Sequence, residues 1–498
     1  MVHDATQMRR SEGPVGRRPP RCDQTPAPQR RARATFITLG SSACCRAIES
    51  DTEDRLTQDA PAGEAHTTVP TQSPESSASL PHRRMSLWRN RDFTAYWLGD
   101  TVSALGTQVT FVALPLVALV TLNVGAAQLG VLRFAEYLPF LAFTLFFGVW
   151  ADRRRRRPLM LASYAVRGAM VALVPLLAVL GLLTPWLLAA IAFVIGTGAA
   201  LFEVCWLTYV PSLVRHERLT EAMGKVVASH SAAEVAGPAL GGLLVHVVTA
   251  PYALLLDTVS YAAGTLSLMR IRQQERDPGR PASPRRSVSE LVLGLRVAFG
   301  EAHIRATAFS AALGNFFGLV TETAFLAYAV HDLRLSPDLI GVVLTAIGAG
   351  GLLGALAANL IIRRVRLGRV YVGSRTVGVL AATLMPLAAG PKAMVVAMCM
   401  ASFFLVQAAL AITNILSSTL RQVLTQDHIR GRMNASVRTV VYGTLSVGSL
   451  AGGILGDAIG LHATLWVGAA GYALSIVPIL LSPIPQLRAM PAPADSVP

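Results

Sequence analysis

The chain has 498 residues, of which 52% are hydrophobic and only 15% are charged, and its formal net charge is +15. Soluble domains carry about 25% charged residues, so this composition excludes an ordinary soluble enzyme and indicates a helical membrane protein with several spans. A basic balance can also mark a nucleic-acid-binding protein. Here, however, the arginines gather in short clusters between apolar segments, which is the pattern that sets membrane topology.

The first segment, residues 1–85, differs from the rest of the chain. It is rich in Arg, Pro, Ser and Thr, and it lacks the apolar core of a signal peptide. A segment of this kind cannot bury enough apolar surface to fold. We therefore predict a disordered basic tail, and we expect translation to begin at Met85.

Twelve apolar segments follow, and each is long enough to cross a bilayer as a helix, because about 20 residues span a hydrocarbon core of about 30 Å. A polar, proline-containing stretch, 271–302, separates the first six segments from the last six. The predicted fold is an all-α membrane protein of two six-helix bundles, 86–270 and 303–485, joined by a cytoplasmic linker and followed by a disordered tail, 486–498. The predicted spans are 94–120, 127–150, 158–182, 185–209, 222–248, 251–270, 303–330, 336–362, 368–389, 391–418, 434–458 and 462–483.

Positive charge in the loops predicts the orientation. The run Arg153–Arg157 contains five consecutive arginines, which would cost more than about 10 kcal/mol at the centre of a bilayer. Arginines recur after the fourth, sixth, eighth and tenth segments, whereas the loops on the opposite side carry only Lys392 and Arg334. Because positive residues stay inside, we expect a protein of the cytoplasmic membrane with both termini in the cytoplasm.

An internal repeat relates the two halves by a shift of 211 residues. Such a repeat predicts two related bundles about an axis normal to the membrane, the arrangement of one large transporter class. The matching pairs are Gly237 and Gly448, Gly241 and Gly452, Gly242 and Gly453, and Tyr261 and Tyr472.

The loop after the second segment carries Gly148, Asp152, Arg153, Arg156 and Arg157. This motif resembles the cytoplasmic signature of the major facilitator superfamily. The resemblance implies that a small residue lets two helices approach and that an Asp–Arg contact breaks when the halves rock, so that the loop latches the outward-facing state. An arginine stands within the loop where the family has a glycine. The alternative is that the arginines only end a helix and set the topology.

The fifth segment carries a second motif, Gly237, Pro238, Gly241 and Gly242. It resembles the motif that the same superfamily associates with antiport, which implies export. Small residues at four-residue spacing make a smooth helix face, and Pro238 can kink the helix. The alternative is that the motif serves only tight packing at the interface between the halves.

Other stretches resemble the branch of this superfamily that includes macrolide and enterobactin exporters. They are LWRNRDFTAYWLGDTVSALG in the first segment, VRHERLTEAMGKVVASHSAAEVAGPALGGLL, LLLDTVSYAAG, and DHIRGRMNAS before the eleventh segment. The likeness covers about residues 86–485.

Ionisable side chains inside apolar segments are costly to keep there, so we expect function to concentrate on them. A carboxyl group in a low-dielectric site can bind a proton on one side and release it on the other, and a nearby arginine can tune it. For each single residue the alternative is a structural ion pair or a helix cap. Arg133 and Glu136 lie three apart and can neutralise each other on one helix face. The proton and substrate candidates are Glu136, Arg133, Glu203, Asp257, Asp100, Glu322 and Arg167.

These features predict a proton-coupled secondary exporter of small hydrophobic or amphipathic compounds, such as a macrolide-like drug, that works by alternating access. One alternative is a siderophore or lysophospholipid exporter, and another, of a different class, is a membrane sensor or partner protein without transport. The sequence contains no P-loop and no zinc-ligand spacing, so we expect no enzyme activity, no cofactor and no metal site. The expected partners are a small-molecule substrate, protons and the lipid bilayer, with no nucleic acid, and we expect a monomer.

Overall fold

The computed structural model describes residues 87–273, 275, 300–425 and 427–491. All of these belong to one compact unit. The predicted basic tail and most of the predicted linker lie outside the described residues. Among the described residues the regular structure is entirely helical, which agrees with the predicted all-α fold.

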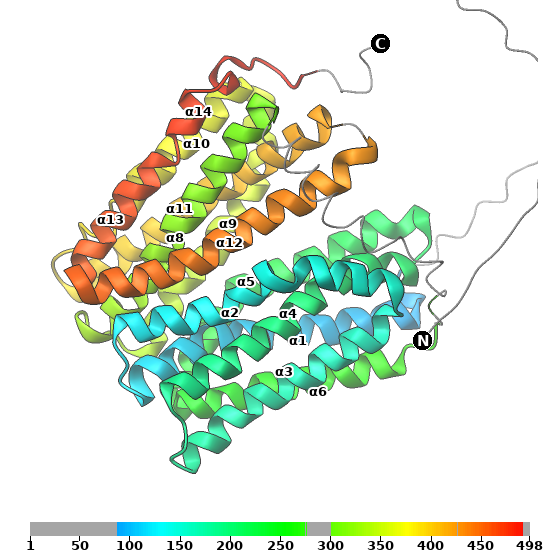
Figure 1. The fold of residues 1–498 in the computed structure, drawn as a ribbon, viewed down its shortest axis with the longest axis vertical. Helices are drawn as coiled ribbons and strands as arrows, with labels where there is room; N and C mark the ends of the chain where they lie inside the picture. The colour runs from blue at the N-terminus through cyan, green and yellow to red at the C-terminus, as the bar shows by residue number, and fades with distance from the viewer. Residues whose placement is uncertain (1–86, 274, 276–299, 426, 492–498) are drawn as a thin grey trace, which may run out of the picture. The chain divides into compact units, whose positions relative to one another are not determined.

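The described residues contain twelve helices of fourteen or more residues, one for each predicted segment (Figure 1). The short helix α14 (Val477–Leu480) follows the last of them. In the N-terminal half they are α1 (Arg91–Leu116), α2 (Ala126–Arg153), α3 (Arg156–Val179), α4 (Pro185–Leu213), α5 (Leu219–Val248) and α6 (Ala250–Arg270); in the C-terminal half they are α8 (Ala302–His331), α9 (Pro337–Arg364), α10 (Leu367–Ala382), α11 (Lys392–Leu424), α12 (Asp427–Ile459) and α13 (Leu461–Leu474).

Local sequence explains where several helices begin and end. Asn90 caps α1, because its side-chain oxygen accepts the backbone N–H groups of Asp92 and Phe93, each at 3.1 Å. Thr184 caps α4 in the same way. Gly181, which follows the C-cap residue Leu180 of α3, has a positive φ of 67°, a conformation that glycine adopts without a steric cost. The two caps satisfy backbone donors that a helix end otherwise leaves unpaired.

Nine of the described helical segments are long and apolar enough to cross a membrane. A tenth is α2, which meets the criterion as two pieces, Ala126–Thr144 and Phe146–Arg153, that are bent by 56°. The all-α membrane fold is therefore confirmed. That α6 and α10 also cross, for a total of twelve, stays a prediction.

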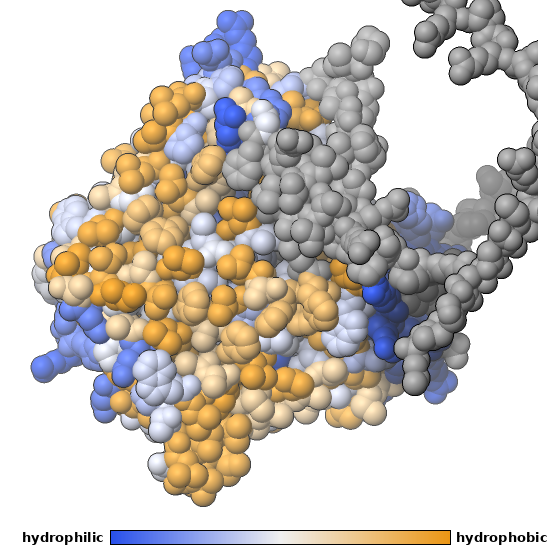
Figure 2. Space-filling view, viewed as in Figure 1, coloured by the Kyte–Doolittle hydropathy of each residue, from blue (hydrophilic) through white to orange (hydrophobic). Residues whose placement is uncertain are grey.

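The surface of the helices is apolar where a soluble protein would be polar. Largely exposed side chains include Phe146, Leu176, Trp186, Val247 and Leu356. Figure 2 shows hydrophobic residues over most of the visible face, with hydrophilic residues toward its margins. Contiguous apolar surface on this scale is unfavourable in water and fits a lipid environment.

Each half packs within itself, and two helix pairs join the halves. In the N-terminal half α1 packs against α5 and α6, and in the C-terminal half α8 packs against α12 and α13. The halves meet where α2 lies along α12 and where α5 lies along α9. These two interfaces provide most of the contact between the halves, and α2 also touches α8.

The two interfaces are related by the 211-residue shift found in the sequence. A Cβ atom added to Gly453 would lie 2.7 Å from the Cα atom of Gly130, and one added to Gly242 would lie 2.7 Å from the Cα atom of Gly341. Both equivalent positions thus hold glycine pairs in backbone-to-backbone contact. The close approach depends on the absence of side chains at these four positions.

Candidate functional site

An ion-paired triad joins the two halves. The guanidinium of Arg133, only 1% exposed, donates from Nη1 to Oε2 of Glu136 at 3.2 Å and from Nη2 to Oε1 of Glu322 at 3.0 Å. Its Cζ atom also lies 4.6 Å from the ring centroid of Phe111. Arg133 and Glu136 come from α2 and Glu322 comes from α8, so one arginine holds carboxylates of both halves.

The triad has an unbalanced charge. Two ionised carboxylates around one guanidinium carry a net charge of −1, and one proton makes the group neutral. Burial penalises an uncompensated charge, so this arrangement is costly to keep between the halves. Sequence spacing placed Arg133 beside Glu136, but the partnership with Glu322, 189 residues away, had no local signal that could have revealed it.

A cavity of about 190 Å³ opens beside the triad in the C-terminal half. Glu322 lines it together with polar residues of α8 and α11, among them Asn315, Thr321 and Gln407. Phe403 and Leu410 supply apolar wall. A cavity with an apolar lining and few polar groups suits a small amphipathic ligand.

The N-terminal half contains a second polar cluster, near the arginine-bearing ends of its helices. Nε2 of His230 on α5 lies 2.8 Å from Oδ2 of the buried Asp100 on α1. The indole N–H of Trp206 donates to Glu203, one turn earlier on α4, at 2.7 Å, and its ring lies 5.7 Å from that of His230. The structure thus brings Asp100 and Glu203 to one region, with His230 as the partner of Asp100.

Asp257 and Arg167 lie in the interior of the N-terminal half. Asp257 on α6 accepts hydrogen bonds from Thr110 at 2.5 Å and from Ser260 at 2.7 Å. Arg167 on α3 donates to the hydroxyl of Thr107 at 3.2 Å, and its guanidinium carbon lies 4.5 Å from the ring centroid of Tyr261. Both residues find these partners within one half, which favours a structural role for them, although Nε of Arg167 has no hydrogen-bond partner among the described residues.

The predicted latch divides into two parts. A Cβ atom added to Gly148 would meet nothing within 4 Å, and Asp152 and Arg153 are exposed. Arg156 and Arg157, in contrast, lie at the start of α3 and bind within their own half. The guanidinium of Arg157 donates to the carbonyl oxygens of Leu268 and Met269 at the end of α6.

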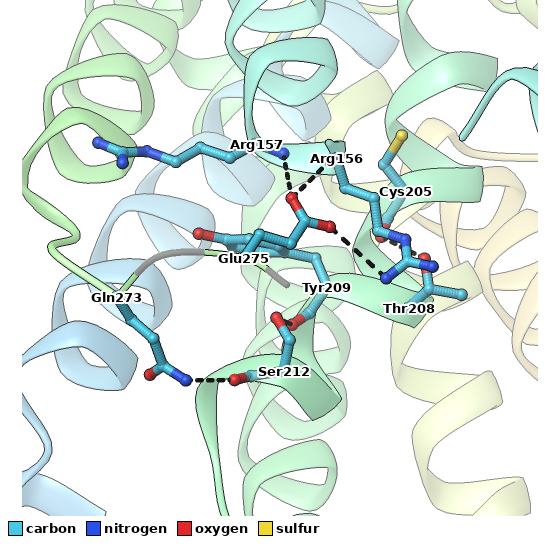
Figure 3. A network of polar contacts seen from close by, with 8 residues as sticks. All are labelled: Arg156, Arg157, Cys205, Thr208, Tyr209, Ser212, Gln273 and Glu275. Atoms are coloured by element: carbon cyan, nitrogen blue, oxygen red, sulfur yellow. Dashed lines mark hydrogen bonds and ion pairs between the residues drawn. The ribbon is translucent and has the colours of Figure 1, made fainter. Parts of the chain in front are cut away.

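Glu275 holds the start of α3, a contact that the sequence did not predict (Figure 3). Its Oε2 atom accepts the backbone N–H groups of Arg156 and Arg157 at 2.6 and 3.3 Å, and its Oε1 atom lies 3.5 Å from Nη1 of Arg156. A carboxylate at the first N–H groups of a helix also interacts well with the helix dipole. Nearby, the side chain of Gln273 donates to the carbonyl oxygen of Ser212 at 2.6 Å, so the start of the linker is tied to the N-terminal half.

The glycines of the fifth-segment motif pack closely on two sides of α5. A Cβ atom added to Gly237 would lie 2.2 Å from Cβ of Gln108 on α1, and one added to Gly241 would lie 3.2 Å from Cα of Val109 on the same helix. Gly242 instead contacts α9 across the interface. The carbonyl oxygen of Pro238 faces α9 as well, 2.4 Å from a Cβ atom placed on Gly341.

Polar contacts also join the two halves at the helix ends that are remote from the arginine-rich loops. The carboxylate of Asp457 on α12 accepts the backbone N–H groups of Ala126 and Ala127, which begin α2, at 3.0 and 3.2 Å. His246 on α5 lies 3.3 Å from Asp338 on α9. Positions 246 and 457 are again related by the 211-residue shift, as are 127 and 338.

No group of three or more His, Cys, Asp or Glu side chains within the described ranges is arranged to hold a metal ion.

Comparison with known proteins identifies the family. The model of the MFS_3 family, described as transmembrane secretion effector, matches residues 84–497. The multidrug efflux pump Tap of Mycolicibacterium fortuitum is 26% identical over 404 residues, which cover 77% of this chain and 93% of that protein. Among solved structures, a bacterial homologue of the iron transporter ferroportin in its inward-facing state has a TM-score of 0.65 at 19% identity, covering 79% of this chain and 98% of that one.

The nucleoside transporter NupG has a TM-score of 0.62 at 13% identity, covering 78% of this chain and 98% of that one. These structural likenesses show the fold, and the family match covers more than half of the chain. The chain therefore belongs to the MFS_3 transmembrane secretion effector family, and it is a transporter of the major facilitator superfamily rather than an enzyme.

Proposed function

We propose that this chain exports small amphipathic compounds from the cell and that inward proton movement drives the export. The related Tap proteins are named multidrug efflux pumps, which supports drug-like compounds as cargo. The observation that carries the proposal is the triad of Arg133, Glu136 and Glu322, in which one guanidinium serves two carboxylates across the interface between the halves.

Coupling follows from the position of Glu322, which belongs both to the triad and to the wall of the cavity. A proton on either carboxylate removes one of the two ion pairs of Arg133, and on Glu322 it weakens the link between α2 and α8. A positively charged or hydrogen-bonding compound in the cavity competes with that proton for Glu322. Proton and compound thus favour different states, which is the condition for coupled exchange.

Alternating access is supported by the way the halves contact each other. The contacts between α2 and α12 begin where Asp457 of α12 binds the start of α2. They continue as far as the stacked rings of Phe140 on α2 and Tyr442 on α12, whose centroids are 4.9 Å apart. Further along α2, Gly148 faces open space. The halves are therefore joined at the ends remote from the arginine-rich loops and separated near Gly148.

By the positive-inside rule the arginine-rich loops would lie in the cytoplasm, so this conformation would be the inward-facing one. Gly148, Asp152 and Arg153 would form the latch when the halves close on that side, and Gly130, Gly242, Gly341 and Gly453 would separate. The protein would lie in the cytoplasmic membrane with both termini inside.

Proton-driven exchange in reconstituted vesicles tests the proposal. Purified protein in proteoliposomes with an internal pH-sensitive dye is mixed with ethidium, and proton movement and ethidium movement are recorded under an imposed pH gradient. We expect Glu322→Gln to abolish pH-driven ethidium movement and to preserve movement down an ethidium gradient, because the neutral amide mimics the protonated state. Glu136→Gln should reduce the pH-driven component less, since Glu322 remains to bind the proton.

Asp332→Asn, at the exposed end of the same helix α8, is the matched control and should behave like the wild type. If Glu322→Gln and Glu136→Gln both kept the full pH-driven component, the triad would not be the coupling site. A wild-type protein that moved neither protons nor ethidium nor other amphipathic dyes would contradict export itself.

A further inference from the structure

Equivalent buried tyrosines of the two halves have different hydrogen-bond surroundings. In the N-terminal half, the hydroxyl of Thr107 lies 3.2 Å from that of Tyr261 and accepts a hydrogen bond from Arg167. The 211-residue shift carries Tyr261 to Tyr472 and Thr107 to Gly318. The C-terminal half thus keeps the tyrosine but has no hydroxyl at the position that satisfies it in the N-terminal half.

A buried arginine accompanies Tyr472, and two of its three nitrogen atoms lack an acceptor. Arg375 on α10 is 1% exposed, and its Nε and Nη1 atoms have no hydrogen-bond partner among the described residues. The hydroxyl of Tyr472 on α13, a residue that is 4% exposed, makes no well-aligned hydrogen bond among them, and the polar group that acts on it most strongly is the guanidinium of Arg375. Unpaired donors on a buried guanidinium are costly, because water is lost and nothing replaces it.

Tyr472 lines the cavity that Glu322 lines, and Arg375 lies directly behind Gly314, another residue of its wall. A Cβ atom placed on Gly314 would be 2.8 Å from Nη1 of Arg375 and 3.7 Å from the ring of Tyr472. Gly314, Gly318 and Tyr472 all line the cavity. A Cβ atom on Gly318 would meet nothing within 4 Å, so the space that Thr107 fills in the other half is open here.

The charge of Arg375 is not balanced by the acidic residue of this cavity. Glu322 is already paired with Arg133 at 3.0 Å. The position equivalent to Asp257, a fully buried carboxylate of the N-terminal half, is Gly468. The C-terminal half therefore has a cation and a hydroxyl donor beside a cavity, but no carboxylate that accepts their hydrogen bonds.

We propose that the C-terminal cavity binds an anionic group, a carboxylate of the transported compound, through the guanidinium of Arg375 and the hydroxyl of Tyr472. The compound class is then an amphipathic molecule that carries an acidic group in addition to the positively charged or hydrogen-bonding group that competes for Glu322. Its remaining surface packs on Phe403 and Leu410. A guanidinium donates to a carboxylate with two parallel N–H groups, which is the geometry that arginine favours. The assignment to a transported compound rests on the proposed function, whereas the anion site itself does not.

Two dyes that differ in one charge test the site. Rhodamine B carries a carboxylate, and its ethyl ester does not. Fluorescence anisotropy with the purified full chain in nanodiscs gives the Kd of each. We expect the wild type to bind rhodamine B at least about tenfold more tightly than the ester, since hydrogen bonds to a charged group are stronger than those to a neutral one.

Variants connect that preference to the residues. Arg375→Gln should remove the preference by weakening rhodamine B binding about tenfold and leaving the ester unchanged, and Tyr472→Phe should reduce it about threefold. Gly318→Thr should weaken both dyes by filling the open space. Gly373→Ala is the matched control, because it lies on the same helix α10 and a Cβ atom there meets nothing within 4 Å. Should Arg375→Gln fail to fold, Tyr472→Phe still decides the question, because it should reduce only the preference for rhodamine B.

The source of the anion is decided by repeating the titrations with and without chloride. Competition by chloride that disappears in Arg375→Gln would assign the site to an inorganic anion as well as to the dye carboxylate. Equal binding of the two dyes by the wild type, or equal loss of both in Arg375→Gln, would overturn the proposal. If rhodamine B bound selectively but was not moved by proteoliposomes, the anion site would stand and export of this compound class would fail.

Discussion

Replacing Gly453 by alanine should shift the balance between the two conformations of this transporter. The added Cβ atom would lie 2.5 Å from the carbonyl oxygen of Ala126 and 2.7 Å from the Cα atom of Gly130. Both are backbone atoms of α2, so they cannot turn away as a side chain does. The contact between α2 and α12 must open, at a cost of about 1–3 kcal/mol, which is typical of overpacking.

That cost applies only to the conformation in which these ends are joined. It should therefore change the equilibrium constant between the two states by about 5- to 150-fold, in favour of the state in which α2 and α12 have separated. Gly148→Ala should act in the opposite sense. Gly148 faces open space here, so the extra methyl group costs nothing in this state, but it would obstruct the latch in the other.

Spin labels at Glu217 and Arg366 report the populations, once the native cysteines have been replaced. Both positions are exposed and lie at the arginine-rich ends of different halves. Electron-electron distance measurements should show the long separation depleted in Gly453→Ala and retained or enriched in Gly148→Ala. An unchanged distance distribution in Gly453→Ala, or a shift of both variants in the same direction, would refute the reasoning.

Three further predictions concern single interactions. Arg133→Ala should lower the stability of the folded protein by about 3–5 kcal/mol, because it leaves two carboxylates without their cation. Thermal unfolding in detergent should show partial recovery of stability when Glu322→Gln is added to Arg133→Ala. A double variant no more stable than Arg133→Ala alone would argue that Arg133 and Glu322 are not paired. Glu275→Ala should increase protease cleavage near the start of α3, because the two N–H groups at that helix end lose their acceptor, at a cost of about 1 kcal/mol. An unchanged cleavage rate would contradict the role of Glu275 as the cap of α3. Asp457→Ala should cost a similar amount at the start of α2 and raise cysteine-reagent access to that end of the interface about fivefold, whereas Asp457→Asn should retain part of the protection.

Hydropathy and loop charge alone predict where the helices lie. The predicted segment 303–330 corresponds to α8, Ala302–His331, and 185–209 corresponds to α4, Pro185–Leu213. A long continuous apolar run in a lipid environment forms an α-helix, because every backbone polar group must then be hydrogen-bonded within the segment itself. The prediction failed to bound α10, which ends at Ala382 although the apolar segment continues to 389, since hydropathy does not report turns.

The repeat was also contained in the sequence, as the shared shift of 211 residues, and it anticipated which glycines would be equivalent. It did not say which of them face α1 and which face the other half. Gly241 and Gly242 are neighbours in the chain, yet the first packs on α1 and the second on α9. Successive helical residues point about 100° apart, and only the packed bundle decides what lies in each direction.

The sequence by itself therefore determined the membrane-spanning helical class, the division into two related halves and the set of costly buried charges. Tertiary structure alone decided how those charges are paired: Arg133 with Glu322 across the halves, Glu275 with the start of α3, and Asp457 with the start of α2, while two nitrogen atoms of Arg375 find no acceptor among the described residues. The physical reason is that hydrophobic partition depends on local composition, whereas an ion pair depends on a distance of a few ångströms between residues that are far apart in the chain.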